Sequence, residues 1–207
     1  MQMEPAVIIV DDDEGMRNAL RRVCRLTGLR VEDYASAQQF LDCHDPATHG
    51  CLVLDINMPG MNGLELQEIL VARSIKLPVI FLTGSSTVAM AVKAMKNGAF
   101  DFLEKPFENE ILLELVRKAV DLDLGSRYEE LHRSLLKERF ALLTSREREV
   151  MQWVVGGKSS KVIARLLDIS VRTVEVHRKN VMAKMQAQSV VELLQMSITI
   201  DGRPAPR

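Results

Sequence analysis

The sequence predicts two folded parts joined by a linker helix: a doubly wound α/β domain with a five-stranded parallel sheet, and an all-helical domain. Within residues 1–120, short apolar runs alternate five times with amphipathic helical patterns. Strands that alternate with helices pair in parallel, and a parallel sheet covered on both faces has almost continuously apolar strands. After residue 140 the patterns are helical only, and cap residues mark their ends.

Composition and charge support two globular domains. The 207 residues are 47% hydrophobic and 27% charged, which suits one large domain or two modest ones. Residues 1–120 carry 12 basic and 17 acidic residues, whereas residues 141–207 carry 11 and 6, so the two parts should have different partners. There is no run of 18 apolar residues and no basic leader, so we expect no membrane association. Cys24, Cys43 and Cys51 form no CxxC pair, which favours reduced thiols in a cytoplasmic protein.

Five strand–helix units fill the first 120 residues. Strands are predicted over residues 6–10, 30–34, 51–54, 77–82 and 100–103. The helix after the first strand has an apolar face made of Met16, Ala19, Leu20 and Val23. The next helix starts at Ser36, which stands at capping-box spacing from Gln39. The remaining helices are predicted over residues 64–71, 88–95 and 111–120.

Polar residues stand where these strands end. Asp11, Asp12 and Asp13 follow the first strand, Asp55 ends the third, Thr83 follows the fourth, and Lys105 and Pro106 follow the fifth. Parallel sheets place their sites at this edge. A dinucleotide site is excluded, because the first turn has acids where glycines would cradle a pyrophosphate. Converging carboxylates need a cation, and oxygen ligands suit Mg²⁺.

This pattern predicts phosphoryl chemistry at Asp55. A carboxylate beside a metal can attack phosphorus and form an aspartyl phosphate. Lys105 would neutralise phosphoryl oxygens, Thr83 would donate a hydroxyl hydrogen bond, and a cis bond at Pro106 would aim Lys105. Taken singly, each Asp is more often a cap or turn residue and the lysine a solvated charge. Their order at successive strand ends makes coincidence a poor explanation.

The segments VIIVDDDEGMR, LVLDINMPGMNGLEL, PVIFLTGSS and GAFDFLEKPF resemble the receiver domain of two-component response regulators, from residue 6 to about 120. The resemblance implies a flavodoxin-like fold with Asp55 as phosphoacceptor. It also implies Mg²⁺ (with Mn²⁺ as a substitute) bound by Asp11, Asp12, Asp55 and the backbone carbonyl of Asn57. Thr83 and Phe102 would form the switch pair. Asp13 occupies a position that varies among receivers.

Residues 122–140 are polar and helix-prone, and are predicted to form the linker helix. Leu122, Leu131, Leu135 and Leu136 give a partial apolar stripe, and Gly125 interrupts the pattern, so fraying is expected there. A dimer seam and a solvated connector both remain open.

The last part, residues 141–207, predicts a helix-turn-helix. Thr144 and Glu147 have capping-box spacing, and Gly156-Gly157 ends that helix. Two further helices meet at a tight turn at Asp168-Ile169, where Asp168 would take the left-handed conformation. A fourth helix covers residues 189–196, and Met182, Met185 and Leu193 are expected in the core.

Basic residues on these helices predict contacts with DNA phosphates: Lys158, Lys161, Arg165, Arg172, Arg178, Lys179 and Lys184. A charged helical face alone is usually just solvated. Over residues 140–197, however, the pattern resembles the LuxR/NarL-type output domain, and the whole chain resembles the FixJ-like subgroup of response regulators. The resemblance places Glu175, Val176 and Lys179 among the base readers, and Arg172, Thr173, His177, Arg178 and Lys184 at the DNA backbone. His177 could instead pack within its own domain.

The sequence therefore predicts a transcription regulator, not an enzyme, that is phosphorylated by a histidine kinase and binds promoter DNA as a homodimer. A metal-dependent phosphohydrolase is the first rival. Such enzymes need an acid two residues after the nucleophile, where this chain has Asn57. The second rival, a DNA-binding protein with a vestigial receiver, conflicts with the intact set of Asp11, Asp12, Asp55, Thr83 and Lys105.

Overall fold

The computed structural model describes residues 4–45, 47–84 and 88–201, and the first three residues and Ser85 and Ser86 of the PVIFLTGSS segment lie outside this range. The chain divides into two compact units, and the boundary along the chain lies between Arg127 and Tyr128. This boundary falls within one long helix, α5 (Asn109–Ala141).

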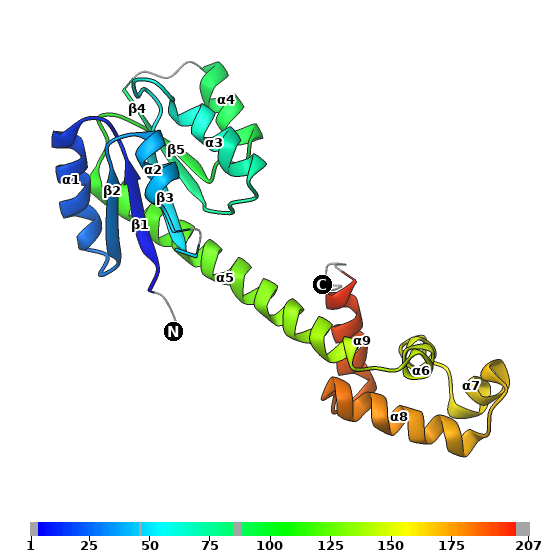
Figure 1. Ribbon diagram of the computed structural model, residues 1–207. Coiled ribbons are helices and arrows are strands. Elements are labelled where there is room, and N and C mark those ends of the chain that lie inside the picture. The colour runs from blue at the N-terminus through cyan, green and yellow to red at the C-terminus, as the bar shows by residue number, and fades with distance from the viewer. Residues whose placement is uncertain (1–3, 46, 85–87, 202–207) are drawn as a thin grey trace. The chain divides into compact units, whose positions relative to one another are not determined.

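The N-terminal unit is the predicted parallel sheet with its crossover helices (Figure 1). The strands are β1 (Ala6–Val10), β2 (Arg30–Tyr34), β3 (Gly50–Asp55), β4 (Val79–Thr83) and β5 (Asp101–Glu104). The helices that precede α5 are α1 (Glu14–Arg25), α2 (Ala37–Cys43), α3 (Gly63–Ala72) and α4 (Val88–Lys96). The strands pair in parallel in the order β2-β1-β3-β4-β5. The predicted fold class is confirmed, although β3 extends one residue beyond each end of its predicted range, β4 starts two residues later and ends one later, and β5 is shifted by one residue.

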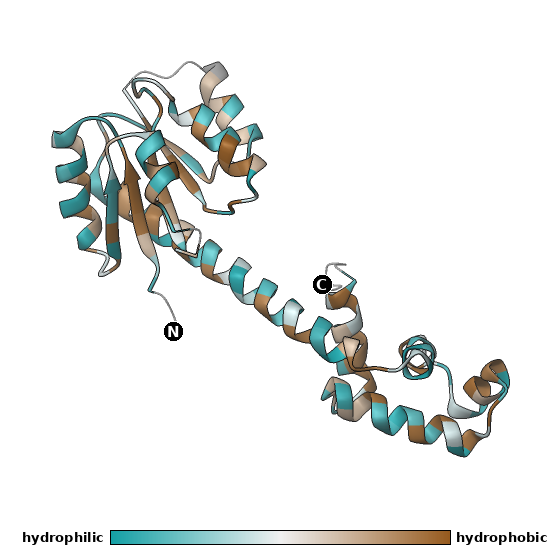
Figure 2. Cartoon of the chain, in the orientation of Figure 1, coloured by the Kyte–Doolittle hydropathy of each residue, from teal (hydrophilic) through white to brown (hydrophobic). Residues whose placement is uncertain are grey.

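Each face of the sheet has its own core. Successive strand residues point to opposite faces, so Ile8 packs with Phe40 on the side of α2, α3 and α4. Its neighbour Ile9 packs with Leu112 on the side of α1 and α5. Figure 2 shows the central strand β1 as apolar and the outer side of α1 as polar. Fully burying each such side chain stabilises the unit by roughly 1.5–3 kcal/mol.

The helix α1 buries a narrower face than predicted. Leu20 is buried, and Met16 and Val23 pack partly against the same core, but Ala19 is exposed. Helical residues turn by about 100° per position, which leaves Ala19 on the solvent side of the stripe. Asp13 caps the helix by accepting a hydrogen bond from the Met16 N–H at 3.1 Å.

The helix α5 does not fray at Gly125, so that prediction is wrong. The buried Asp123 carboxylate accepts a hydrogen bond from the Gly50 N–H at 2.8 Å, and Arg127 Nε donates to the same carboxylate at 3.0 Å. Arg127 also donates to the Thr48 carbonyl at 3.3 Å. A glycine costs a helix interior about 1 kcal/mol, and these bonds on both sides of Gly125 offset that cost.

The C-terminal unit is helical, as predicted, and packs α6 (Ser145–Val155), α7 (Ser160–Leu167), α8 (Val171–Met185) and α9 (Val190–Ile200) against the end of α5. Thr144 and Glu147 form the expected capping box. Asp168 has φ 51° and ψ 51°, the left-handed conformation predicted for the turn between α7 and α8. Met185 and Leu193 are buried, and Met182 packs against them. Among the described residues, no helix has the length and apolarity needed to cross a membrane.

Candidate functional site

Three of the predicted side chains meet at the carboxyl edge of the sheet. Asp11 follows β1, Asp55 ends β3, and Lys105 follows β5. The Lys105 ammonium lies 2.9 Å from Asp11 Oδ2 and 2.8 Å from Asp55 Oδ1, so it bridges the two carboxylates. The two acids are almost fully buried, with 1% and 6% of their surface exposed.

The order of the strands explains why these residues meet. From β1 the chain crosses to β2 on one side, and the later strands follow on the other side beyond β3. The crossovers after β1 and β3 therefore diverge and leave a crevice at this topological switch point. Asp11 and Asp55 stand at the carboxyl ends of β1 and β3, the two neighbouring strands that flank it.

Burial and charge pairing oppose each other in this crevice. Burial raises the pKa of Asp11, although hydrogen bonds from Lys105 and the Asp13 N–H act in the other direction. Burial also acts to lower the pKa of Lys105, but its hydrogen bonds to Asp55 and Asp11 outweigh that effect, and the pKa is raised. One partly buried cation therefore faces two buried acids, so the pair of carboxylates lacks a full counter-charge from Lys105 alone.

The other predicted residues of the N-terminal unit surround this crevice. Thr83 is fully buried at the end of β4, and its carbonyl accepts the Lys105 N–H at 2.7 Å. Phe102 on β5 is partly buried against the core on the side of α2, α3 and α4. The Asn57 N–H donates to Asp55 Oδ2 at 3.0 Å. The Lys105–Pro106 peptide bond is cis, as predicted.

The donor set fits a hard cation that keeps part of its water shell. Asp12 is exposed at the rim, and Asp13 is occupied as the α1 cap. Over residues 4–45, 47–84 and 88–201, no three Asp, Glu, His or Cys side chains converge as a ready-made metal cluster. Mg²⁺ needs no such cluster, since it binds through one or two carboxylates and retains waters. Asp11 and Asp55, with too little positive charge beside them, match that requirement.

Gly63 is a residue of this site that the sequence reading missed. A Cβ at Gly63 would lie 2.4 Å from the Asp55 carbonyl oxygen, so only glycine lets the start of α3 approach the strand end. The Gly63 N–H also donates to the Ile56 carbonyl at 3.0 Å. A glycine directly after the helix cap Asn62 is the sequence feature that could have revealed it.

In the C-terminal unit, α8 has two distinct faces. Val174, Val181 and Met185 are buried against the other helices. The opposite face exposes five predicted DNA-contact residues: Arg172, Thr173, Glu175, Val176 and Lys179. Their spacing of three and four residues aligns them on one side of the helix. Ser170 fixes the start of α8 through its hydroxyl, which accepts the Thr173 N–H at 3.0 Å.

The remaining predicted contacts differ in their surroundings. Lys161 is exposed on α7, whereas His177 and Arg178 are half-buried on α8. The His177 Nδ1 atom is buried and has no hydrogen-bond partner among the described residues, so that edge of the ring packs within its own domain while the side chain stays partly exposed. Lys184 points its ammonium at the buried Glu147 carboxylate, 2.6 Å away, so the structure gives it a partner inside the unit.

Comparison with known proteins identifies both units. Residues 7–117 match the response regulator receiver domain, and residues 141–197 match the luxR family of bacterial regulatory proteins. The chain is a response regulator. The receiver contains the acidic crevice, and the luxR-type domain contains the exposed face of α8.

Relatives and solved structures extend the match over nearly the whole response regulator. It is 43% identical to the transcriptional regulatory protein FixJ of Azorhizobium caulinodans, over 96% of this chain and 94% of that protein. It is 41% identical to the response regulator protein TodT of Pseudomonas putida, over 92% and 84%. The structure of the response regulator StyR has a TM-score of 0.85 at 41% identity, covering 94% and 98%. Full-length FixJ from B. japonicum has a TM-score of 0.60 at 38% identity, covering 98% and 100%.

The family defines the general activity of this response regulator. It is a phosphorylation-dependent, DNA-binding transcription regulator of a two-component system. Its receiver belongs to a family in which phosphorylation generally depends on Mg²⁺. A histidine kinase and DNA are the partners that the two domains imply.

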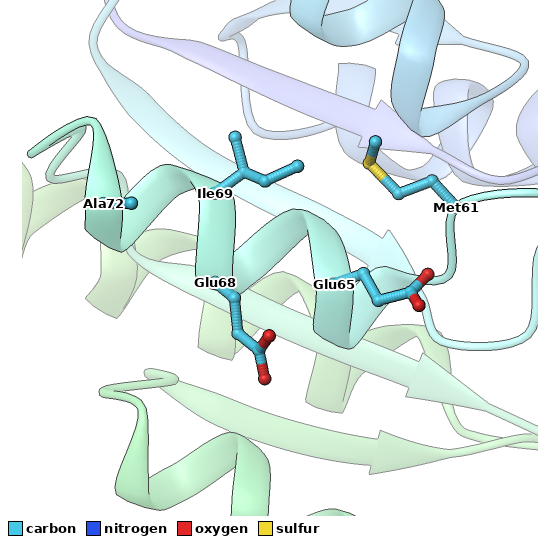
Figure 3. Close-up of a pocket in the computed structure, with 5 residues that line it drawn as sticks. All are labelled: Met61, Glu65, Glu68, Ile69 and Ala72. Atoms are coloured by element: carbon cyan, nitrogen blue, oxygen red, sulfur yellow. The ribbon is translucent and has the colours of Figure 1, made fainter.

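The response regulator also has a shallow groove along α3, separate from the acidic crevice (Figure 3). Its lining residues are Met61, Glu65, Glu68, Ile69 and Ala72. Glu68 pairs with the Lys93 ammonium at 2.8 Å, whereas Glu65 belongs to the capping box of α3 and accepts the Asn62 N–H at 2.9 Å. Both acids therefore already serve the packing and the start of α3.

Proposed function

We propose that Asp55 accepts the phosphoryl group, and that its phosphorylation drives dimerisation and promoter binding. The observation that carries this proposal is the Lys105 ammonium held between Asp11 and Asp55, 2.9 and 2.8 Å away, at the switch point of the sheet. That geometry presents a carboxylate nucleophile beside a cation able to hold phosphoryl oxygens.

The proposed transfer is a displacement at phosphorus. A carboxylate oxygen of Asp55 bonds to phosphorus as the phosphorus–nitrogen bond to the kinase's histidine breaks, and the histidine ring keeps the bonding electron pair. Lys105 then pairs with a phosphoryl oxygen, and the Thr83 hydroxyl donates to another. Positioning and charge stabilisation account for catalysis of this type.

Mg²⁺ completes the charge balance in this proposal, and Mn²⁺ is a possible substitute. The residues that would hold it are Asp11, Asp12, Asp55 and the main-chain carbonyl of Asn57. Bound there, it neutralises charge on the phosphoryl oxygens. The exposed position of Asp12 supports a ligand that acts directly or through a water.

The proposed output runs through a surface of the receiver. When Thr83 turns to the phosphoryl group, Phe102 rotates into the space it leaves and repacks α4, β5 and the first half of α5. This surface exposes apolar side chains, including Val92, Met95 and Ile111, which supports its use as a dimer contact. The added charge shifts an existing equilibrium towards the dimer.

Dimerisation is proposed to bring two copies of α8 onto DNA half-sites about 34–36 Å apart. Glu175, Val176 and Lys179 contact bases, while Lys161, Arg172, Thr173, His177 and Arg178 contact the backbone. Lys184 is not among these proposed DNA contacts, because its ammonium pairs with Glu147. Joining two weakly binding domains in one dimer raises the apparent affinity for DNA by roughly 10²–10⁴-fold without a new base contact.

The domain limits proposed from the sequence also stand as a proposal. They are a receiver over residues 1–121, a linker over 122–140 and the DNA-binding domain over 141–207, in a protein that acts in the cytoplasm without turning over other substrates. In the linker, Leu122, Leu131 and Leu135 are exposed, whereas Leu136 is buried in the C-terminal unit. The exposed leucines support a contribution to the dimer seam.

Asp55→Asn tests the acceptor. Asparagine is nearly isosteric but cannot form an acyl phosphate, so labelling of the full chain by acetyl phosphate with Mg²⁺ should vanish. Asp42→Asn, a change of an exposed acid on α2, is the matched control and should label like the wild type. Full labelling of Asp55→Asn would move the acceptor elsewhere. Hydrolysis of many equivalents of a generic phosphomonoester would favour the phosphohydrolase.

A further inference from the structure

Arg17 binds the backbone of the acidic turn, residues 11–13. It lies in the first turns of α1, and its Nη1 atom donates to the Asp11 carbonyl at 2.8 Å and to the Asp12 carbonyl at 2.9 Å. Only 13% of its side chain is exposed. One guanidinium nitrogen therefore ties together the two peptide groups that carry the acidic pair.

A second set of contacts fixes the guanidinium itself. Asp33 on β2 lies with Oδ2 at 3.7 Å from Arg17 Nε. Arg21, one turn further along α1, donates two hydrogen bonds of 3.0 and 2.6 Å to the same carboxylate. Asp33 lies opposite Ile9 in the pairing of β2 with β1. The contacts of Asp33 with Arg17 and Arg21, called the Asp33 brace below, therefore hold Arg17 against the sheet just before the acidic turn.

The other hydrogen bonds of the acidic turn act at its two ends, where the Asp11 N–H donates to the Tyr34 carbonyl at 3.3 Å and the Arg17 N–H donates to the Asp13 carbonyl at 2.9 Å. The Asp13 N–H donates to Asp11 Oδ1 at 2.9 Å, and the Asp13 carboxylate caps α1. These bonds set the Asp11 side chain and the helix start. The path of the backbone at Asp12, which decides where that exposed carboxylate stands, is set from the Arg17 side.

We propose that Arg17 is a positioning residue of the acidic site, which places the Asp11 and Asp12 carboxylates to receive a divalent cation. The inference rests on the proposed function for the identity of the cation. Groups that orient metal ligands typically change metal affinity by about 10–100-fold when they are removed. We therefore expect Arg17→Gln to weaken Mg²⁺ binding by at least about tenfold.

The sign of this effect separates positioning from simple electrostatics. Arg17 is a cation close to a cation site, so loss of its charge alone would strengthen Mg²⁺ binding. Loss of the two carbonyl hydrogen bonds would loosen the turn and weaken binding. In a folded Arg17→Gln chain, a weaker affinity therefore reports the second effect.

The test is a calorimetric titration of the full chain with Mg²⁺, read alongside thermal unfolding without Mg²⁺. Arg22→Gln removes the same charge from an exposed position of α1 and should bind as the wild type does. Arg21→Gln, which weakens the Asp33 brace and spares the carbonyl bonds, should fall in between. Arg17→Lys keeps the charge but loses the fixed fork geometry, so it should also bind more weakly than the wild type.

Each outcome supports or overturns a separate statement. Wild-type or tighter affinity in Arg17→Gln overturns the positioning role. If Arg17→Gln does not fold, wild-type affinity in both Arg17→Lys and Arg21→Gln overturns it equally. Absence of Mg²⁺ binding by the wild type, with Asp12→Ala indistinguishable from it, contradicts the proposed metal site instead.

Discussion

At the scale of single residues, two partly buried lysines perform different tasks. Lys105 divides its ammonium between two carboxylates, which leaves the acidic crevice short of positive charge. Lys184 serves one carboxylate, Glu147, at 2.6 Å. Glu147 also accepts the Thr144 N–H at 2.8 Å, so this pair locks the start of α6 to α8. The arrangement at Lys105 leaves negative charge that a bound cation can neutralise, whereas the Lys184–Glu147 pair stabilises the C-terminal unit.

The Glu147–Lys184 pair predicts a pH dependence of stability. The hydrogen bond from Lys184 lowers the pKa of Glu147 from 4.5 to about 2. A carboxyl whose pKa is lower in the folded state contributes stability above pH 4.5, and this contribution is lost as the pH falls towards 2. Urea unfolding of the full chain, followed by the fluorescence of its single tryptophan, Trp153 on α6, should show that loss.

Matched variants isolate this pair. Glu147→Gln should lower the free energy of unfolding near neutral pH and flatten its dependence between pH 4.5 and 2. Lys184→Gln should do the same. Lys179→Gln changes an exposed lysine on the same helix and should leave the stability curve unchanged. An unchanged curve for Lys184→Gln would return Lys184 to the DNA-contact set.

At the scale of elements, α5 shows how a distant contact overrides a local weakness. Its Gly125 has open space where a Cβ would stand and lies within an uninterrupted helix. Gly125→Ala should therefore raise the free energy of unfolding by about 0.5–1 kcal/mol, because alanine restricts the unfolded chain and favours the helix. Thermal or urea denaturation measures this directly.

Gly50→Ala is the contrasting control. Gly50 has φ 134°, and a Cβ there would lie 1.8 Å from the Ala6 carbonyl oxygen, so alanine should destabilise the receiver strongly. If Gly125→Ala destabilises the chain as well, Gly125 serves a bend that the helix needs, and the account of α5 is wrong.

The same contrast explains what the sequence could predict. Apolar runs, helix caps and polar strand ends are local patterns, and they were enough for the fold class, the capping box at Thr144 and the meeting of Asp11, Asp55 and Lys105. The continuity of α5 depends on the Asp123–Gly50 bond, which joins residues 73 positions apart. The pairing of Lys184 with Glu147 spans 37 positions. A pattern of neighbours cannot show which distant partner a charged side chain will meet.

At the scale of the whole molecule, phosphate uptake and DNA binding should be separable. Thr83→Ala removes the hydroxyl proposed to follow the phosphoryl group but leaves Asp55 and Lys105 in place. We expect it to accept phosphate from acetyl phosphate to a similar extent, and to gain much less dimer and DNA affinity than the wild type. Labelling and sedimentation velocity on the same samples measure the two effects. Equal dimerisation of the phosphorylated variant would remove Thr83 from the switch.

Phosphorylation of Asp55 is proposed to drive dimerisation and thereby DNA binding. The most direct test is sedimentation velocity of the wild-type chain, with and without acetyl phosphate and Mg²⁺, titrated into a genomic fragment selected for binding. Asp55→Asn runs alongside as the control. Phosphorylation of the wild type should raise both the dimer fraction and the affinity for the fragment, whereas Asp55→Asn should gain neither. A rise in affinity while the phosphorylated protein stays monomeric, both free and on DNA, would contradict this proposal.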